Sequence, residues 1–301
     1  MSMELVFAIE VLIAGLLSGV MYSLVALGFV LIFKASGVFN FAQGAMVLFA
    51  ALTFVRILEM GVNFWLAIVI SLIVMIVLAV VIERITLRPL VAQPVIILFM
   101  ATIGLNYFLE GLAQAVWDSE VHGLDLGIPD VPWVEFMEST NILISLFDVW
   151  SAVICGVLVL LLAFFFQKGR IGRALRAVAD DHQAAMSVGI PLQMIWAIVW
   201  AAAGMVALVA GALWGQRLGV QFSISLVALK ALPVLILGGF NSIAGAILGG
   251  LIIGASEKLA EVYLGPVIGG GLESWAAYFI AMLFLIFRPQ GLFGEEIIER
   301  V

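Results

Sequence analysis

Hydrophobic residues fill the chain in long stretches that only scattered polar residues interrupt. Charged residues bound uncharged stretches at 11–33, 35–55, 60–82, 89–109, 149–167, 182–216 and 231–256. A helix needs about 20 apolar residues to cross a bilayer, and these stretches are too long for the short alternating strands of a membrane barrel. The pattern therefore predicts an all-α, polytopic membrane bundle with about 8–9 membrane elements.

One interrupted stretch occurs twice. "SLVALGFVLIFKASGVFNFAQGA" at 23–45 is matched by "SLVALKALPVLILGGFNSIAGA" at 225–246, with FN and GA at the same spacing. Pro233 and the glycine pair that follows it predict a helix break in the second copy. Asparagine favours the first position of a helix, so each copy is interpreted as helix, break and a new helix capped by Asn40 or Asn241. An internal duplication is favoured over coincidence.

Broken helices leave backbone ends unpaired and can build a polar path through a membrane. The candidate pathway residues are Asn40, Gln43, Lys230, Asn241 and Ser242. The alternative is that the asparagines only cap helices at the cytoplasmic surface. Lys230 would be costly in lipid. It either snorkels from a helix end, faces a pore, or pairs with a carboxylate such as Glu257 or Glu261.

Charge placement predicts the orientation. Basic residues crowd the loop at about 168–190, which the positive-inside rule places in the cytoplasm. The loop at about 118–148 holds acidic residues and no Lys or Arg, so it is expected outside as a folded connector with a short hairpin. Its carboxylates lack the spacing of a metal site. This topology puts the amino terminus outside and the carboxyl terminus in the cytoplasm.

Composition excludes a soluble domain, because 65% of the 301 residues are hydrophobic and only 11% are charged. Glu4 and Glu10 stand where a signal peptide would be basic, so the first stretch is interpreted as an uncleaved membrane helix. Cys155, the single cysteine, is expected to be a small core residue. Small-residue spacings that allow close helix packing occur at Gly15–Gly19, Gly245–Gly249 and Gly250–Gly254.

The loop "QKGRIGRALRAVADDHQAAMSVGIP" at 167–191 has helical periodicity. One face is mainly apolar, with Ile171, Leu175, Val178, His182 and Ala185. The opposite face is small and polar, with Arg173, Ala177, Asp180, Ala184 and Ser187. Such a face suits a groove on a partner protein. The alternative is an amphipathic helix on the lipid headgroups, which would usually have a larger apolar face.

This loop resembles a known family. "GRALRAVADDHQAAMSVGI" is similar to the cytoplasmic coupling loop of ABC importer permeases. Together with the two repeated stretches and the ending "FRPQGLFGE", it resembles the branched-chain amino acid transporter permease family over nearly the whole chain. Urea, amide and aromatic-acid relatives share these motifs. The length is similar to the shorter, H-type member of the two paralogous permeases that such systems use.

The resemblance implies a permease in a bacterial-type cytoplasmic membrane, forming half of a pathway for branched-chain, hydrophobic amino acids by alternating access. The implied partners are a second paralogous permease, two ATPase subunits, an external solute-binding protein, the lipid bilayer and a small-molecule substrate. ATP and Mg would be bound by the ATPases, so this chain is expected to hold no cofactor and to be no enzyme.

The coupling positions carried over by the resemblance lie in residues 173–189. They are Arg173, Arg176, Ala177, Asp180, Asp181, Ala184 and Gly189. The sequence also departs from the family. Gln43 stands where many relatives carry histidine, and Phe240 and Ala244 stand where glycine and proline are frequent, which leaves the detail of the helix break open.

Other functions find little support. No glycine is directly followed by lysine, which excludes a Walker A loop. His122 and His182 fall in separate predicted loops, which disfavours a histidine zinc site or a Ser-His catalytic arrangement. The basic residues follow membrane topology and not a nucleic-acid patch. The alternative function is a self-sufficient channel or secondary carrier for a small polar solute such as urea or an amide, which would not need a cytoplasmic docking helix.

Overall fold

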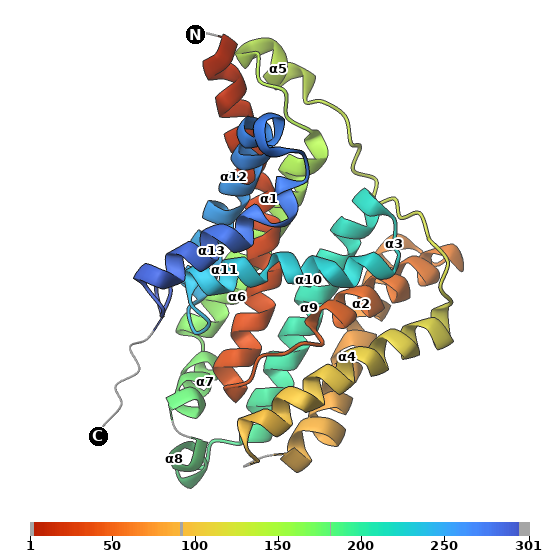
Figure 1. Ribbon diagram of the computed structural model, residues 1–301. Coiled ribbons are helices and arrows are strands. Elements are labelled where there is room, and N and C mark those ends of the chain that lie inside the picture. The colour runs from red at the N-terminus through yellow and green to blue at the C-terminus, as the bar shows by residue number, and fades with distance from the viewer. Residues whose placement is uncertain (1–2, 91–92, 181, 295–301) are drawn as a thin grey trace. The chain divides into compact units, whose positions relative to one another are not determined.

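The computed structural model describes residues 3–90, 93–180 and 182–294, and within these ranges the regular elements are all helices. Figure 1 labels most of them along the chain. They are α1 (Met3–Ser36), α2 (Gln43–Glu59), α3 (Phe64–Val81), η1 (Ile82–Leu87), η2 (Arg88–Leu90), α4 (Val95–Trp117), α5 (Val134–Thr140), α6 (Leu146–Lys168), α7 (Arg170–Asp180), α8 (His182–Ser187), α9 (Leu192–Leu218), η3 (Phe222–Leu226), α10 (Val227–Lys230), α11 (Leu232–Gly238), α12 (Ile243–Ile268), η4 (Leu272–Ser274) and α13 (Ala276–Phe287).

Six of the described helical segments are long and apolar enough to cross a membrane. They are Met3–Ser36, Phe64–Leu90, Val95–Trp117, Leu146–Lys168, Leu192–Leu218 and Ile243–Ile268. Two shorter apolar segments, Phe222–Gly238 and Ala276–Phe287, accompany them. The all-α, polytopic prediction is confirmed, and the expected number of membrane elements holds only approximately.

The chain forms two compact units. Unit 1 contains residues 1–26, 127–159 and 229–301, and unit 2 contains residues 27–126 and 160–228. The two copies of the repeated stretch therefore contribute their helix breaks to different units.

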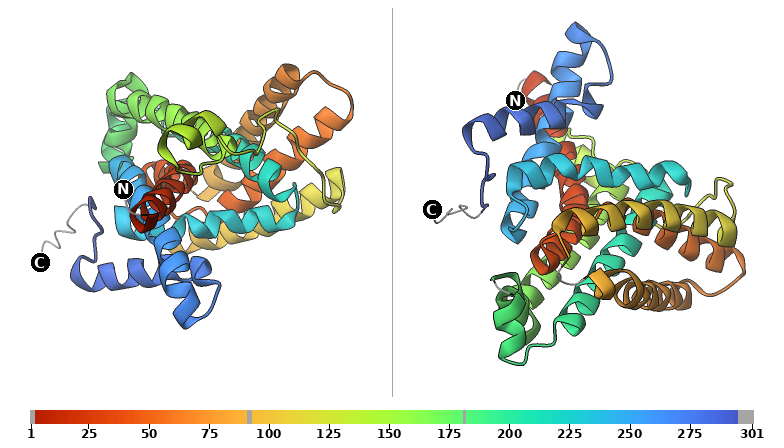
Figure 2. Two further views of the ribbon diagram at one scale, coloured as in Figure 1. Left: turned by 90° about the horizontal axis from the view of Figure 1, so that it is seen from above. Right: turned by 60° about the horizontal axis from the view of Figure 1, so that its bottom comes forward.

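In unit 1, the first part of α1 packs closely against α12, as Figures 1 and 2 both show. Glycines on both helices allow this approach: a Cβ added at Gly15 would lie 2.7 Å from Cα of Ala255, and one added at Gly19 would lie 2.5 Å from the carbonyl oxygen of Gly250. Ser23 adds a hydrogen bond from Oγ to the carbonyl of Ile247 at 3.1 Å. The small-residue motifs thus mark a real helix crossing, as expected.

In unit 2, α2 is buried along almost its whole length. It contacts α3, α4, α9 and η3. Close approach to α9 depends on Gly211, where an added Cβ would lie 2.6 Å from the carbonyl oxygen of Val47. A helix of 17 residues that is covered on every side needs no polar face, which explains why its sequence is apolar throughout most of its turns.

The acidic segment 127–148 of unit 1 pairs its two ends in antiparallel fashion around α5, in line with the expected hairpin. Pro132 and Ser145 form an isolated bridge. Trp133 donates its N–H to the carbonyl of Ile144 at 2.9 Å, and Leu146 donates to Val131 at 2.9 Å. These bonds satisfy the backbone without a full strand.

Replacing Gly19 with alanine should destabilise unit 1, because the added methyl group meets backbone atoms that cannot rotate away. We expect a loss of about 1–3 kcal/mol in the free energy of unfolding. The measurement is thermal unfolding in detergent, followed by tryptophan fluorescence. Gly104→Ala is the matched control, since an added Cβ there meets nothing within 4 Å. Equal midpoints for the two variants would contradict the close crossing.

Candidate functional site

The first helix break lies between α1 and α2 in unit 2, and side chains form the hydrogen bonds around it. Asn40 and Gln43 are fully buried. Asn40 Oδ1 accepts the backbone N–H of Ala42 at 3.1 Å, and its Nδ2 donates to Gln43 Oε1 at 3.4 Å. Gln43 Nε2 in turn donates to the carbonyl of Ala203 at 3.4 Å, and Thr102 Oγ1 donates to the carbonyl of Phe39 at 3.2 Å. The break is a closed polar network packed inside the unit.

The second break lies between α11 and α12 in unit 1, and mainly backbone groups form the hydrogen bonds around it. α11 ends at Gly239, whose φ of 98° favours glycine. The carbonyl of Leu237 accepts the N–H of Leu292 at 2.7 Å, and the carbonyl of Gly238 accepts the N–H of Phe293 at 3.1 Å. The segment after α13 therefore supplies the hydrogen bonds that the end of α11 lacks.

The helix-cap prediction is wrong at both breaks. α2 is preceded by Ala42, with no side-chain cap, because the Asn40 carboxamide bonds the N–H of Ala42 and the Gln43 side chain, and so acts in the turn before the helix. α12 is capped by Ser242, whose Oγ accepts the N–H of Gly245 at 2.9 Å, and not by Asn241. Serine and asparagine are equally good caps, so propensity alone could not fix the register by one residue.

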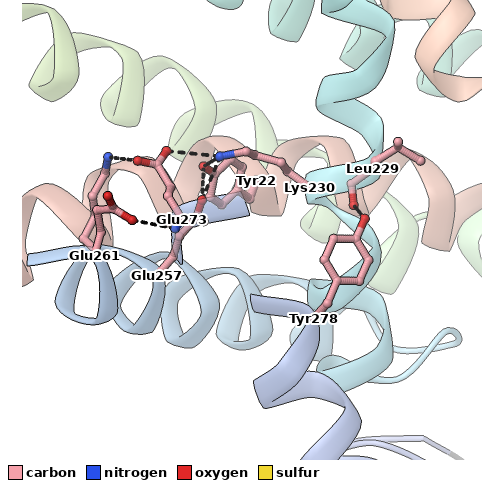
Figure 3. Close-up of polar contacts among 8 residues, drawn as sticks. Tyr22, Leu229, Lys230, Glu257, Glu261, Glu273 and Tyr278 are labelled. Atoms are coloured by element: carbon pink, nitrogen blue, oxygen red, sulfur yellow. Dashed lines mark hydrogen bonds and ion pairs between the residues drawn. The ribbon is translucent and has the colours of Figure 1, made fainter. Parts of the chain in front are cut away.

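Lys230 of unit 1 pairs with a carboxylate, which was one of the three expected alternatives. Its Nζ lies 2.7 Å from Oε1 of Glu257, whose side chain is 2% exposed. Tyr22 from α1 lies beside both groups: its hydroxyl is 3.5 Å from each of these atoms, and Lys230 Nζ lies 5.8 Å from the centre of its ring. Figure 3 shows the three side chains converging. The buried carboxylate thus has a counter-ion and a hydroxyl donor.

Three further residues complete this ion cluster, and sequence reasoning missed two of them. Glu273 in η4 accepts from Lys230 at 3.1 Å through Oε1 and from Lys258 at 3.0 Å through Oε2. Glu261, the other carboxylate expected near Lys230, instead accepts backbone N–H groups of Gly271 at 3.1 Å and Glu273 at 2.8 Å. Burial raises the pKa of Glu273, but the two lysines outweigh it and hold the pKa below its ordinary value.

The predicted coupling segment forms two helices, α7 and α8. Leu175, Val178 and Ala185 are buried, whereas the residues of the small polar face are exposed or half-buried. The two-faced prediction is confirmed for these residues. Asp181 lies outside the described residues.

Three of the carried-over coupling residues have roles within the chain. Arg173 Nη1 donates to the carbonyl of Lys168 at 3.2 Å. Arg176 Nη1 donates to the carbonyls of Phe166 and Gln167, each at 3.1 Å, which caps the end of α6. Gly189 has a φ of 84° and donates its N–H to the carbonyl of Met186 at 3.0 Å, which ends α8. Arg173, Asp180 and Ala184 present exposed side chains. Their partner contacts stay a prediction.

A second charged cluster surrounds His122 in unit 2, where the sequence offered no candidate. The imidazole is 7% exposed and lies between two carboxylates: Nδ1 is 2.9 Å from Glu59 and Nε2 is 3.1 Å from Asp118. Arg56 bridges the same carboxylates at 2.7 and 3.3 Å. Both ring nitrogens can donate only when the ring is protonated. The backbone of His122 also exchanges two hydrogen bonds with Val220, which joins the segments that follow α4 and α9. The side chains of Arg56 and Glu59 add the end of α2 to this cluster.

Replacing Lys230 with methionine should leave the buried Glu257 carboxylate without its nearest counter-ion. We expect a loss of about 3 kcal/mol in the free energy of unfolding, at the low end for a broken buried ion pair because Lys258 still balances part of the charge. The double variant Lys230→Met, Glu257→Gln should regain most of that stability, measured by thermal unfolding. A double variant no more stable than the single one would argue against the pair.

Raising the pH should loosen the His122 cluster. Burial lowers the pKa of His122, but hydrogen bonds and charge from Asp118 and Glu59 outweigh it and hold the pKa above its ordinary value. The protonated imidazole therefore stabilises the fold fully below about pH 6.5, and this stabilisation is lost as the pH rises through the pKa of His122 in the folded protein. His122→Gln should therefore flatten the dependence of the unfolding midpoint on pH between about 6 and 9. Parallel curves for the two proteins would contradict the assignment.

Comparison with known proteins was made for the whole chain. A profile of the family described as "Branched-chain amino acid transport system / permease component" matches residues 11–288. The high-affinity branched-chain amino acid transport system permease protein BraD of Pseudomonas aeruginosa is 29% identical, covering 99% of this chain and 99% of the relative. The corresponding permease protein LivH of Escherichia coli K12 is 27% identical over the full length of both.

A solved structure, PsaBC from Streptococcus pneumoniae in complex with Fab, covers 91% of this chain and 89% of that chain at 17% identity, with a TM-score of 0.46. A likeness at that level adds nothing to the assignment. The family profile spans both units and includes both helix breaks, the Lys230 cluster and α7–α8. The chain is a multi-pass membrane protein and belongs to the branched-chain amino acid transport system permease family.

Proposed function

We propose that this chain is the permease subunit of an ATP-driven importer for branched-chain amino acids. The observation that carries the proposal is the family match over residues 11–288, together with relatives of the same length that are named as permease proteins of such systems. The chain would line half of a pathway that opens alternately to the two sides of the inner membrane. A differential affinity of its partners for these two states, and not bond chemistry in this chain, would drive the change.

The proposed assembly contains a second permease, two ATPase subunits that bind ATP and Mg, and an external solute-binding protein. The proposed orientation places the amino terminus outside and the carboxyl terminus in the cytoplasm, because the basic segment 168–190 and the acidic segment 118–148 then follow the positive-inside rule. ATP hydrolysis is assigned to the partners, and this chain is proposed to need no cofactor of its own.

The described geometry of α7 and α8 supports the docking of an ATPase. Leu175 and Val178 are buried, so these helices present their other face outward, with Arg173, Asp180 and Ala184 exposed. Arg176 caps the end of α6 with two hydrogen bonds, which fixes α7 to that membrane helix. A push on the exposed face would therefore be transmitted to α6. This connection is what a coupling element requires.

Co-purification from native membranes in mild detergent tests the proposed assembly. Recovery of two P-loop ATPases and a second hydrophobic permease, identified by mass spectrometry, is the expected result. The complex should then take up leucine into vesicles only when ATP is present. Isolation of this chain alone, passing urea or an amide through liposomes without ATP, would replace the proposal with the channel or carrier.

Replacing Ala184 with phenylalanine should impair docking, because the bulky ring would occupy a small exposed position on α8. We expect ATP-dependent uptake to fall by about tenfold, which corresponds to about 1.4 kcal/mol of lost coupling. Insertion into the membrane should be unchanged. Ser139→Phe is the matched control, since Ser139 is exposed on α5 in the segment proposed to lie outside. Full uptake by the Ala184 variant would overturn the coupling assignment.

A further inference from the structure

Residues 269–275, which we call the return segment, lead the chain from the end of α12 back along that helix. Two glycines with positive φ allow the reversal. The side chain of Leu272 is 2% exposed, and the Glu261 carboxylate accepts the backbone N–H groups of Gly271 and Glu273. These contacts fix the return segment to α12, and Figure 3 shows the one between the Glu261 carboxylate and Glu273.

Lys230 is shared between two carboxylates that differ in exposure. Its bond to Glu257 is shorter, at 2.7 Å, and the Glu257 side chain is 2% exposed. Its bond to Glu273 is longer, at 3.1 Å, and the Glu273 side chain is 35% exposed. Breaking the first pair would leave a buried charge without a counter-ion, whereas an exposed pair gains little from its attraction because water competes. The link to Glu273 is therefore the one that can open.

Neither group would be left unpaired when this link opens. Glu273 would keep Lys258, which contacts its other oxygen at 3.0 Å. Lys230 would keep Glu257 and the neighbouring Tyr22 hydroxyl. Every lysine would thus retain a carboxylate both in the arrangement that the structure shows and in one where this link is open. A small difference in free energy between two such arrangements is what a switch requires.

The position of Lys230 connects this exchange to the junction between α10 and α11. Lys230 is the last residue of α10, and one residue separates it from α11, which carries Pro233 near its start. We propose that the Lys230–Glu273 pair is a releasable latch between the junction of α10 and α11 and the return segment, with the Lys230–Glu257 pair as its pivot. The latch opens and closes as the permease changes state. Its part in transport rests on the proposed function, but the two arrangements belong to this chain alone.

The test measures a distance within unit 1, using spin labels on the chain in lipid nanodiscs. Leu229→Cys beside the latch and Val267→Cys near the end of α12 provide exposed attachment sites, at 47% and 83% exposure. The buried native thiol is removed by Cys155→Ala. Pulsed electron spin resonance then gives the distribution of label separations. The unsubstituted cluster should show two populations.

Two substitutions separate a latch from a merely structural cluster. Glu273→Gln weakens the link to Lys230 and should raise the open population by about threefold. Lys258→Met removes the competing cation and should lower the open population by a similar factor. A cluster that only stabilises the fold would loosen in both variants, so shifts in the same direction, or no shift in either, would overturn the latch.

The assembled importer provides the second measurement. ATP with vanadate, which traps the ATPases, should change the ratio of the two populations in the labelled complex. A complex that transports leucine but keeps one fixed distribution through the cycle would overturn the latch and leave the proposed function intact. Failure of the unsubstituted complex to transport would instead reject the proposed function, while opposite shifts in the two variants of the isolated chain would still support the latch.

Discussion

Hydrocarbon offers a polypeptide no hydrogen bonds, so the chain can leave helical geometry within a membrane only where other protein groups bond the freed backbone. Both helix breaks obey this constraint, but with different means. Around the first break, buried side chains do the bonding, with Asn40 holding the N–H of Ala42 and Thr102 holding the carbonyl of Phe39. At the second break, the backbone of Leu292 and Phe293 bonds the last carbonyls of α11.

The same constraint governs the charges. Lys230 stands in an apolar stretch because Glu257 and Glu273 bond it, and Glu273 is in turn bonded by Lys258. In unit 2, the two carboxylates of the His122 cluster are bonded by the imidazole between them and by an arginine that bridges them. Each cluster ties together helices that come from distant parts of the chain.

Much of this architecture was predictable from local pattern. Long uncharged stretches indicated the membrane helices, the glycine pair at 238–239 marked the second break, and Gly15 and Gly19 marked the close helix crossing. Pro233, which was expected to contribute to the second break, lies instead in the first turn of α11. These signals are local because helix length, helix breaking and small size are properties of neighbouring residues. The two faces of α7 and α8 followed from helical periodicity for the same reason.

The charged clusters were predictable only in part. The Lys230–Glu257 pair could be proposed because a lone lysine in an apolar stretch needs a partner. Glu273 was missed because it is 43 positions from Lys230 in a glycine-rich segment with the composition of a solvated loop. His122 was missed because Glu59 is 63 positions away, between two other predicted membrane elements. The N-caps were misplaced for two reasons. The Asn40 side chain bonds within the turn before α2, and serine caps a helix as well as asparagine does, so Ser242 could replace Asn241 at α12.

The hydrogen bonds that complete the end of α11 also form in a fixed order relative to translation. Leu237 and Gly238 leave the ribosome well before Leu292 and Phe293, whose N–H groups complete their hydrogen bonds. While α12 and α13 are still being made and inserted, these two carbonyls must be bonded by water or by the insertion machinery. The second break therefore closes after translation of its own helix pair, and it is among the last parts of unit 1 to mature.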